Sequence, residues 1–96
     1  MPGMPTKAEL AQLDESSGLE ADDLFTHLMI RHHAGGIAMA NYAAEHGEHS
    51  GVRALARTMA RVQGTEINEI NARRVALGLP PVPRSEIRKL ETVHSA

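Results

Sequence analysis

The sequence contains no cysteine and no tryptophan, and it has one phenylalanine and one tyrosine among its 96 residues. The absence of cysteine excludes a disulfide framework, a thiolate metal site and a cysteine nucleophile. With so few aromatic side chains in 10.4 kDa, the chain can build at most one small domain, and the core of that domain must be aliphatic.

The sequence also lacks an excess of positive charge. Ten Lys and Arg residues stand against 12 Asp and Glu residues, which gives a formal net charge of −2. Nothing is therefore available to neutralise the phosphates of a nucleic acid or the surface of an anionic membrane, and we expect neither as a partner.

Several sequence signals of targeting and catalysis are missing as well. No apolar run approaches the ~18 residues of a membrane span, and residues 1–5 lack the basic and apolar regions of a signal peptide. No phosphate-binding glycine loop and no nucleophile-elbow motif occurs. We therefore predict a protein that is not an enzyme.

Histidine and methionine are abundant instead, with six His and five Met in this short chain. Imidazole and thioether are the soft or borderline metal ligands that remain when thiolate is absent, and together they favour copper, Cu(I) in particular, over Mg²⁺ or Ca²⁺. The composition thus raises the hypothesis of a soft-metal site.

Helix signals run along the whole chain, and no segment shows the period-2 alternation of a strand, so we predict an all-α fold. Thr6 and Glu9 form a capping-box pattern that starts a short first helix, and 16–18 ends it. A long second helix is expected to start near Asp22 or Asp23 and to run to about Glu45.

A turn at 46–51 then leads into a third helix over 52–77, which Gly78 and the prolines after it terminate. Ser85 is expected to cap a short terminal helix that carries Ile87, Leu90 and Val93. The chain divides accordingly into an N-terminal segment (1–21), a core helical hairpin (22–78) and a proline-rich linker with a short helix (79–96).

One side of each long helix is apolar and is expected to face inward. In the second helix this side consists of Phe25, Met29, His32, His33, Gly36, Met39, Ala40 and Ala43, whereas His27 and Arg31 point away. In the third helix it consists of Val52, Leu55, Ala56, Met59, Gln63, Glu66, Ile67, Ile70 and Leu77.

The polar members of these stripes converge if the two long helices form an antiparallel hairpin about a turn centred near His49. His32 and His33 then lie level with Gln63 and Glu66. Likewise, Met39 lies level with Met59. Because an unpaired buried imidazole or carboxylate costs ~1–3 kcal/mol, this convergence calls for a physical reason.

Two interpretations of this layer remain open. It is either a structural polar layer that fixes helix register, with the methionines as filling of the core, or a metal site. Met29 lies three residues before His32 and four before His33, spacings at which helical neighbours can reach one ion. The candidate ligands on this interpretation are Met29, His32, His33, Met39, Met59, Gln63 and Glu66.

The ordered combination of these elements over residues 22–77 resembles the domain-of-unknown-function family 305. The resemblance consists of a Met-Ile-x-His-His stretch (29–33), its Ala- and Met-rich continuation, and a Gln-x-x-Glu-Ile element (63–67). It implies a ferritin-like helical bundle, an association with copper, and an exported, envelope or extracellular location. With His32, His33 and Met29, this leads to the hypothesis of a non-enzymatic copper-binding protein used for sequestration or tolerance. Carried over by position, the family pattern falls on Met29, His32, His33, Met39, Gln63 and Glu66.

Many members of that family carry two such units in tandem, and residues 3–6 are similar to the join that precedes the second unit. We therefore expect a single unit that is similar to the C-terminal half of two-unit members. A lone hairpin leaves half of each apolar helix face in water, so we expect a homodimer that completes a four-helix bundle. The alternative function is a structural dimerisation module whose polar layer only sets packing.

Overall fold

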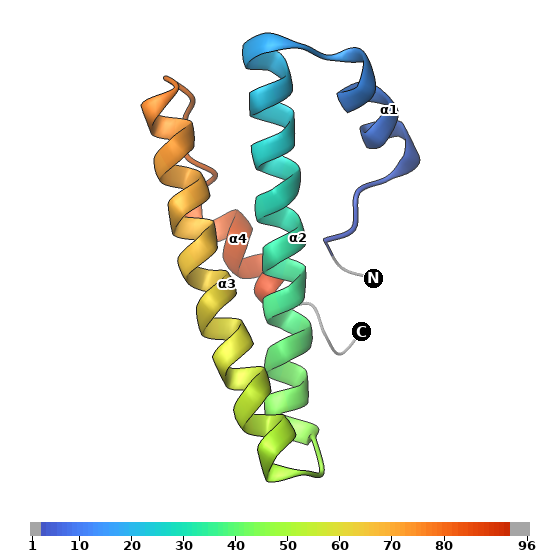
Figure 1. Ribbon diagram of the computed structural model, residues 1–96, viewed down its shortest axis with the longest axis vertical. Helices are drawn as coiled ribbons and strands as arrows, with labels where there is room; N and C mark the ends of the chain where they lie inside the picture. Colours follow the sequence, from blue (N-terminus) through green and yellow to red (C-terminus); the bar gives the residue numbers. More distant parts are fainter. Residues whose placement is uncertain (1–2, 93–96) are drawn as a thin grey trace.

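The computed structural model describes residues 3–92, which form four helices and no strand (Figure 1). The helices are α1 (Lys7–Glu15), α2 (Gly18–His46), α3 (Ser50–Ala76) and α4 (Arg84–Glu91). The predicted all-α class is therefore confirmed for this part of the chain. Within the same range, no helix is both long enough and apolar enough to cross a bilayer.

The capping box of α1 is formed as predicted. The Thr6 hydroxyl accepts a hydrogen bond from the Glu9 amide at 3.0 Å, and the Glu9 carboxylate accepts one from the Thr6 amide at 2.9 Å. Two backbone donors that the first turn leaves without helical partners are thereby satisfied.

The starts of the other three helices differ from the prediction. α2 begins at Gly18 rather than at Asp22 or Asp23, and Asp23, inside the helix, binds Arg74 through its carboxylate. α3 begins at Ser50 rather than at Val52. α4 begins directly after Pro83, so the prediction that Ser85 caps it was wrong. Pro83 already has the φ of a helix entry, and its carbonyl accepts the first helical bonds. Val93, which was assigned to this helix, lies outside the described residues.

The two long helices lie side by side and antiparallel, as the sequence predicted, and α1 lies beside α2 on the side away from α3 (Figure 1). Two contacts set the register of the hairpin. His33 meets Glu66, and one turn further along a side chain at Gly36 would overlap the Gln63 amide. Gly36 therefore gives Gln63 the space to lie across α2.

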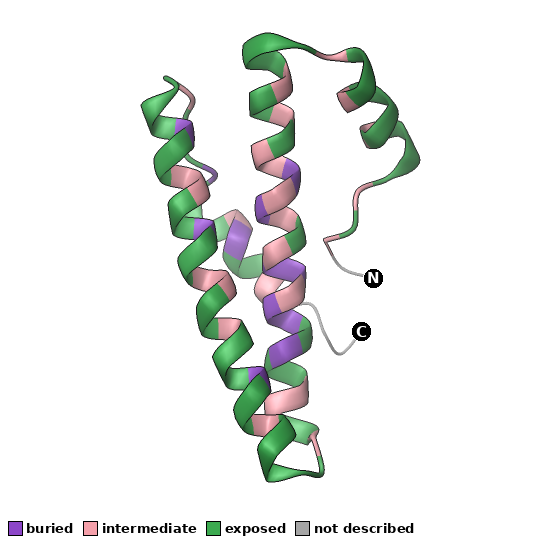
Figure 2. Ribbon diagram, viewed as in Figure 1, coloured by how far each residue is buried: buried purple, intermediate pink, exposed green. Residues whose placement is uncertain are grey.

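The closed core coincides only in part with the predicted inward face. Ala40, Ala56 and Ile67 were predicted to face inward and are buried, whereas Ile30, Ala34 and Ile37 were not predicted. The buried members of the core cluster are Ile30, Ala34 and Ile37 from α2, Ile67 from α3, and Val82 and Ile87 from the C-terminal segment. α2 thus has two apolar sides, and α4 with the chain before it covers one of them. Figure 2 shows the result, with buried positions concentrated along α2 and exposed ones along most of α3.

The face that the sequence predicted to point inward is accordingly open in the single chain. Its large side chains are each about half exposed, namely Phe25, Met39, Val52, Leu55 and Met59. A lone hairpin was expected to leave half of each apolar helix face in water, and these exposed side chains agree with that expectation. Helical periodicity did not predict that α4 covers a second apolar side of α2.

Arg74 joins the ends of the hairpin to the C-terminal segment. Its side chain is 4 % exposed, and its guanidinium donates to the Asp23 carboxylate, the Thr26 hydroxyl and the carbonyls of Asp23 and Pro80. A buried cation with this many acceptors is fully compensated. Arg74 therefore fixes the path of the chain from α3 toward α4.

Two further ion pairs hold the short helices against α2. Arg31 binds Glu9 of α1 through both terminal guanidinium nitrogens, and the His27 ring lies 2.9 Å from the Glu86 carboxylate of α4. The hydrogen bond from Arg31 lowers the pKa of Glu9 from 4.5 to about 2. His27 and Arg31 were predicted to point away to solvent. They instead bind the flanking helices.

Candidate metal site

The open face of the hairpin is a continuous groove between α2 and α3, made of two adjoining cavities. On each helix its lining residues recur at steps of three or four, with some adjacent pairs, so they form one stripe per helix. One cavity is lined by Phe25, Thr26, Met29, His33, Glu66, Glu69, Ile70 and Arg73. The other is lined by Gly36, Met39, Ala40, Ala43, Val52, Leu55, Ala56, Met59 and Gln63.

His33 is held in a defined orientation at this groove. Its Nδ1 lies 2.7 Å from the carbonyl oxygen of Met29, one helical turn earlier. A carbonyl can only accept, so Nδ1 carries the hydrogen and donates it. This is the bond by which metal-binding histidines are oriented in proteins, and it leaves Nε2 to face a ligand.

The Nε2 atom of His33 lies 3.5 Å from Oε1 of Glu66 on α3. With Nδ1 protonated, a neutral ring would turn a lone pair toward a carboxylate oxygen, which is unfavourable. A cation placed between the two atoms would bind both of them. The His33 side chain is 13 % exposed and that of Glu66 is 49 % exposed, so the pair is reachable from the groove.

The separation of these two atoms fits a shared ion. Nitrogen and oxygen donors bind first-row divalent ions such as zinc at about 2.0–2.2 Å, so two donors 3.5 Å apart subtend about 105–120° at a common ion. That angle suits a four-coordinate site. The imidazole and carboxylate thus have the chemistry and the spacing to hold a metal.

Met29 is the third candidate ligand in this cavity, whose volume is about 350 Å³. It precedes His33 by one turn on the same face of α2, and its own carbonyl is the acceptor that orients the ring. The thioether of Met29 would add a soft donor to the imidazole and carboxylate, a set compatible with copper.

The remaining candidates fall in two other places. Met39, Met59 and Gln63 line the adjoining cavity of about 310 Å³, which confirms that the hairpin brings the two methionines together. His32 is exposed and lines neither cavity of the groove. Its ring meets that of His33 edge to face, with centroids 6.0 Å apart, so its predicted place in the core was wrong.

One chain supplies only part of a coordination shell. Among residues 3–92, no three His, Cys, Asp or Glu side chains lie close enough together to hold one ion. A metal ion held by His33 and Glu66 would therefore need further ligands from a thioether, from water or from another molecule.

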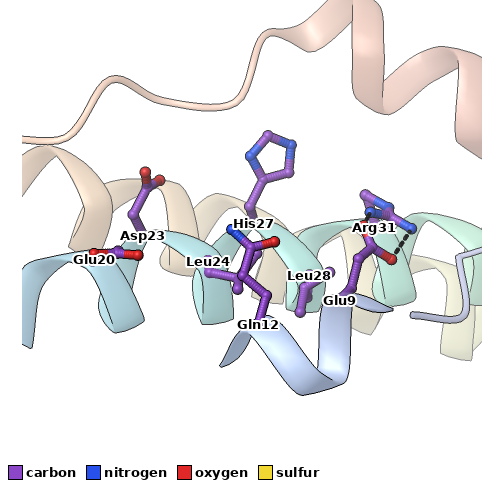
Figure 3. Close-up of a pocket in the computed structure, with 8 residues that line it drawn as sticks. All are labelled: Glu9, Gln12, Glu20, Asp23, Leu24, His27, Leu28 and Arg31. Carbon is purple, nitrogen blue, oxygen red and sulfur yellow. Dashed lines mark hydrogen bonds and ion pairs between the residues drawn. The ribbon is translucent and has the colours of Figure 1, made fainter. Parts of the chain in front are cut away.

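A third cavity, of about 250 Å³, lies between α1 and α2 (Figure 3). Its polar lining is dominated by the Arg31–Glu9 pair, with Gln12 reaching over from α1 and His27 turned toward α4. Because these charged groups already bind each other, this cavity serves to dock the flanking helices.

Sequence reasoning missed several members of the groove and of its frame. Glu69 and Arg73 line the His33 cavity but were not singled out, although each follows Glu66 at helical spacing. Arg74 was missed because no local pattern marks a buried arginine, and its acceptor Asp23 lies 51 positions away. Such a pair is visible only once the hairpin has folded.

These features define a class, that of small helical-hairpin proteins with an open apolar groove and a His–Glu pair at its centre. The family model described as Domain of unknown function (DUF305) matches residues 1–74. The chain belongs to this family, as the resemblance of its His-His and Gln-x-x-Glu elements predicted. Neither the curated proteins nor the solved structures that were searched gave a match.

Proposed function

We propose that this protein binds copper ions in the groove without catalysing a reaction, as a sequestering protein in copper tolerance. The observation that supports the proposal is the His33–Glu66 pair, in which an imidazole oriented through Nδ1 turns Nε2 toward a carboxylate 3.5 Å away. A copper ion would take the position between the ring nitrogen and the carboxylate oxygen.

The candidate ligands divide into a principal site and a second position. His33, Glu66 and Met29 share one cavity and form the principal site, which suits Cu(II) as well as Cu(I). Met39 and Met59 share the adjoining, mostly apolar cavity and form a thioether position suited to Cu(I), with Gln63 between the two. His32, exposed beside His33, is the nearest additional imidazole.

The proposal also includes the ferritin-like architecture that the resemblance implies. α2 and α3 would be one half of a four-helix bundle, and a second copy of the chain would supply the other half. The open groove supports this, because its apolar side chains are the ones that a second hairpin would cover.

Isothermal titration of the metal-free protein tests copper binding. We expect the wild type to bind Cu(II) and the His32→Ala, His33→Ala double variant to lose this binding. His46→Ala, His49→Ala is the matched control, because it removes two exposed histidines at the turn. Unchanged binding in the double variant at 32 and 33, or equal loss in the control, would refute the proposal.

The structural dimerisation module is the second candidate function. It is favoured by the two contacts of the His33 ring, which lies against the Met29 carbonyl and the Glu66 carboxylate. These contacts can give the polar groups of the layer partners without a metal. On this account the same double variant melts at a lower temperature or changes its oligomeric state, while copper leaves the melting temperature of the wild type unchanged. Thermal melts with and without Cu(II) separate the two functions.

A further inference from the structure

The two cavities of the groove run together over a long apolar face with nothing packed on it among residues 3–92. On α3 the face extends from Val52 to Arg73, which corresponds to about 33 Å of helix. Five of its large apolar side chains are each about half exposed, with Leu55 the most exposed at 59 %. A face of this kind is a protein contact surface.

The size of the face matches a specific dimer. Two helices of about 10 Å diameter lying side by side present a strip about 20 Å wide, so the face covers about 650 Å². Each partner in a standard protein interface buries about 600–1,000 Å². The small residues Ala40 and Ala43 along α2 would let a second pair of helices approach closely.

The position of the His33–Glu66 pair on this face is the observation that leads further. His33 and Gly36 lie midway along the α2 stripe, which runs from Phe25 to Ala43. Level with them, Gln63 and Glu66 lie in the middle third of the α3 stripe. The pair is therefore at the centre of the face.

A two-fold axis that packs this face on itself must lie in the plane of contact, either along the helices or across them. In the first case α2 faces α3 of the second copy, and in the second case α2 faces its own counterpart. Under both, the centre of one groove meets the centre of the other. When the two faces overlap fully, the central layer therefore meets itself under either axis.

We infer that two copies of this chain pack groove to groove, and that the principal metal site is shared between them. This inference rests on the proposed copper binding. Each chain contributes Nε2 of His33 and Oε1 of Glu66, two donors at the spacing of one four-coordinate ion. Two such pairs complete the shell that one chain leaves incomplete, so the dimer binds one Cu(II) per two chains.

Sedimentation velocity and native mass spectrometry of the full chain, metal-free and titrated with Cu(II), test this inference. We expect a dimer at micromolar concentration under both conditions and one Cu(II) per two chains at saturation. A folded wild-type monomer overturns the inference, and so does a dimer that binds one Cu(II) per chain at the His33 site.

The variant Leu55→Asp tests the effect of dimer formation on copper binding without changing a proposed ligand. It places a charge in the face but away from His33, and we expect a folded monomer whose Cu(II) affinity is lowered at least tenfold. Ala54→Asp adds the same charge on the exposed outer side of α3 and should leave mass and affinity unchanged. Unchanged affinity in a monomeric Leu55→Asp variant overturns the shared site but leaves copper binding in place.

Failure of the proposed function gives a different result. If the wild type binds no Cu(II), the proposed function and the shared ion both fail, while the mass of the metal-free wild type still decides whether the groove is a dimer interface. If Leu55→Asp does not fold, the inference is tested by the mass of the wild type and by its number of bound Cu(II) ions per two chains. Circular dichroism of each variant establishes folding before these measurements.

Discussion

Nε2 of His33 on α2 lies 3.5 Å from Oε1 of Glu66 on α3, while Nδ1 of the same ring bonds to the carbonyl of Met29. The ring therefore has one nitrogen committed to its own helix and the other turned to the facing helix. This relationship joins the register of the hairpin to the proposed chemistry, because a shift of one helical turn would separate the two side chains.

The two adjacent histidines should differ in their effect on copper. We expect His33→Ala to lower Cu(II) affinity at least 100-fold, because it removes the oriented nitrogen beside Glu66. His32→Ala should lower it less than tenfold, because His32 is exposed and lines neither cavity of the groove. Isothermal titration of the two single variants measures the difference, and equal losses would contradict the assignment of His33 as the principal ligand.

Replacing Met39 and Met59 should reduce Cu(I) binding and leave Cu(II) binding unchanged. Met39→Leu, Met59→Leu keeps the apolar character and approximate volume of the adjoining cavity but removes both thioethers. We expect this variant to bind fewer equivalents of Cu(I) than the wild type and the same amount of Cu(II). Competition with a Cu(I) chelator under reducing conditions measures the first quantity. An unchanged Cu(I) capacity would show that Met39 and Met59 only pack.

The docking of α1 should depend on acid pH through Glu9. The folded-state pKa of Glu9, about 2, lies below its ordinary value of 4.5 because Arg31 donates to the carboxylate. Its contribution to stability is therefore present above pH 4.5 and is lost as the pH falls toward 2. Amide exchange in α1 should accelerate across this window relative to α3. In Glu9→Gln this pH dependence should disappear, and a wild-type profile in that variant would contradict the role of the pair.

Arg74 should matter for stability more than any exposed arginine. Arg74→Met leaves the Asp23 carboxylate and the Pro80 carbonyl without the guanidinium that donates to them, and we expect the free energy of unfolding to fall by about 2–3 kcal/mol. Arg57→Met, at an exposed position on the same helix, should change it by about 0.5 kcal/mol or less. Urea unfolding of both variants measures the difference, and similar midpoints would contradict the role of Arg74.

The sequence predicted local and periodic features well. The capping box of Thr6 and Glu9, the turn before α3 and the register that brings Glu66 to His33 all follow from spacing along one or two helices. The covered face could not be predicted in the same way. α2 has apolar residues on two sides, and the choice between Ile30 and Met39 as core depends on where the segment carrying Val82 and Ile87 packs.

The long-range polar contacts show the same limit. Asp23 had the local pattern of a helix N-cap, and only the closing of the hairpin shows that it binds Arg74. Likewise, His27 and Arg31 had the pattern of solvated residues, and they bind Glu86 and Glu9 because the flanking helices fold back on α2. Polar groups on a helix surface are therefore interpreted correctly only when the elements that cover them are known.

The most direct test of the account follows the histidine ring resonances of the wild type as Cu(II) is added below one equivalent per two chains. Paramagnetic Cu(II) broadens the signals of the residues that bind it. The account predicts that the ring signals of His33, with those of the adjacent His32, disappear first, while those of His46 and His49 at the turn persist. Loss of the His46 and His49 signals before those of His33 would contradict it.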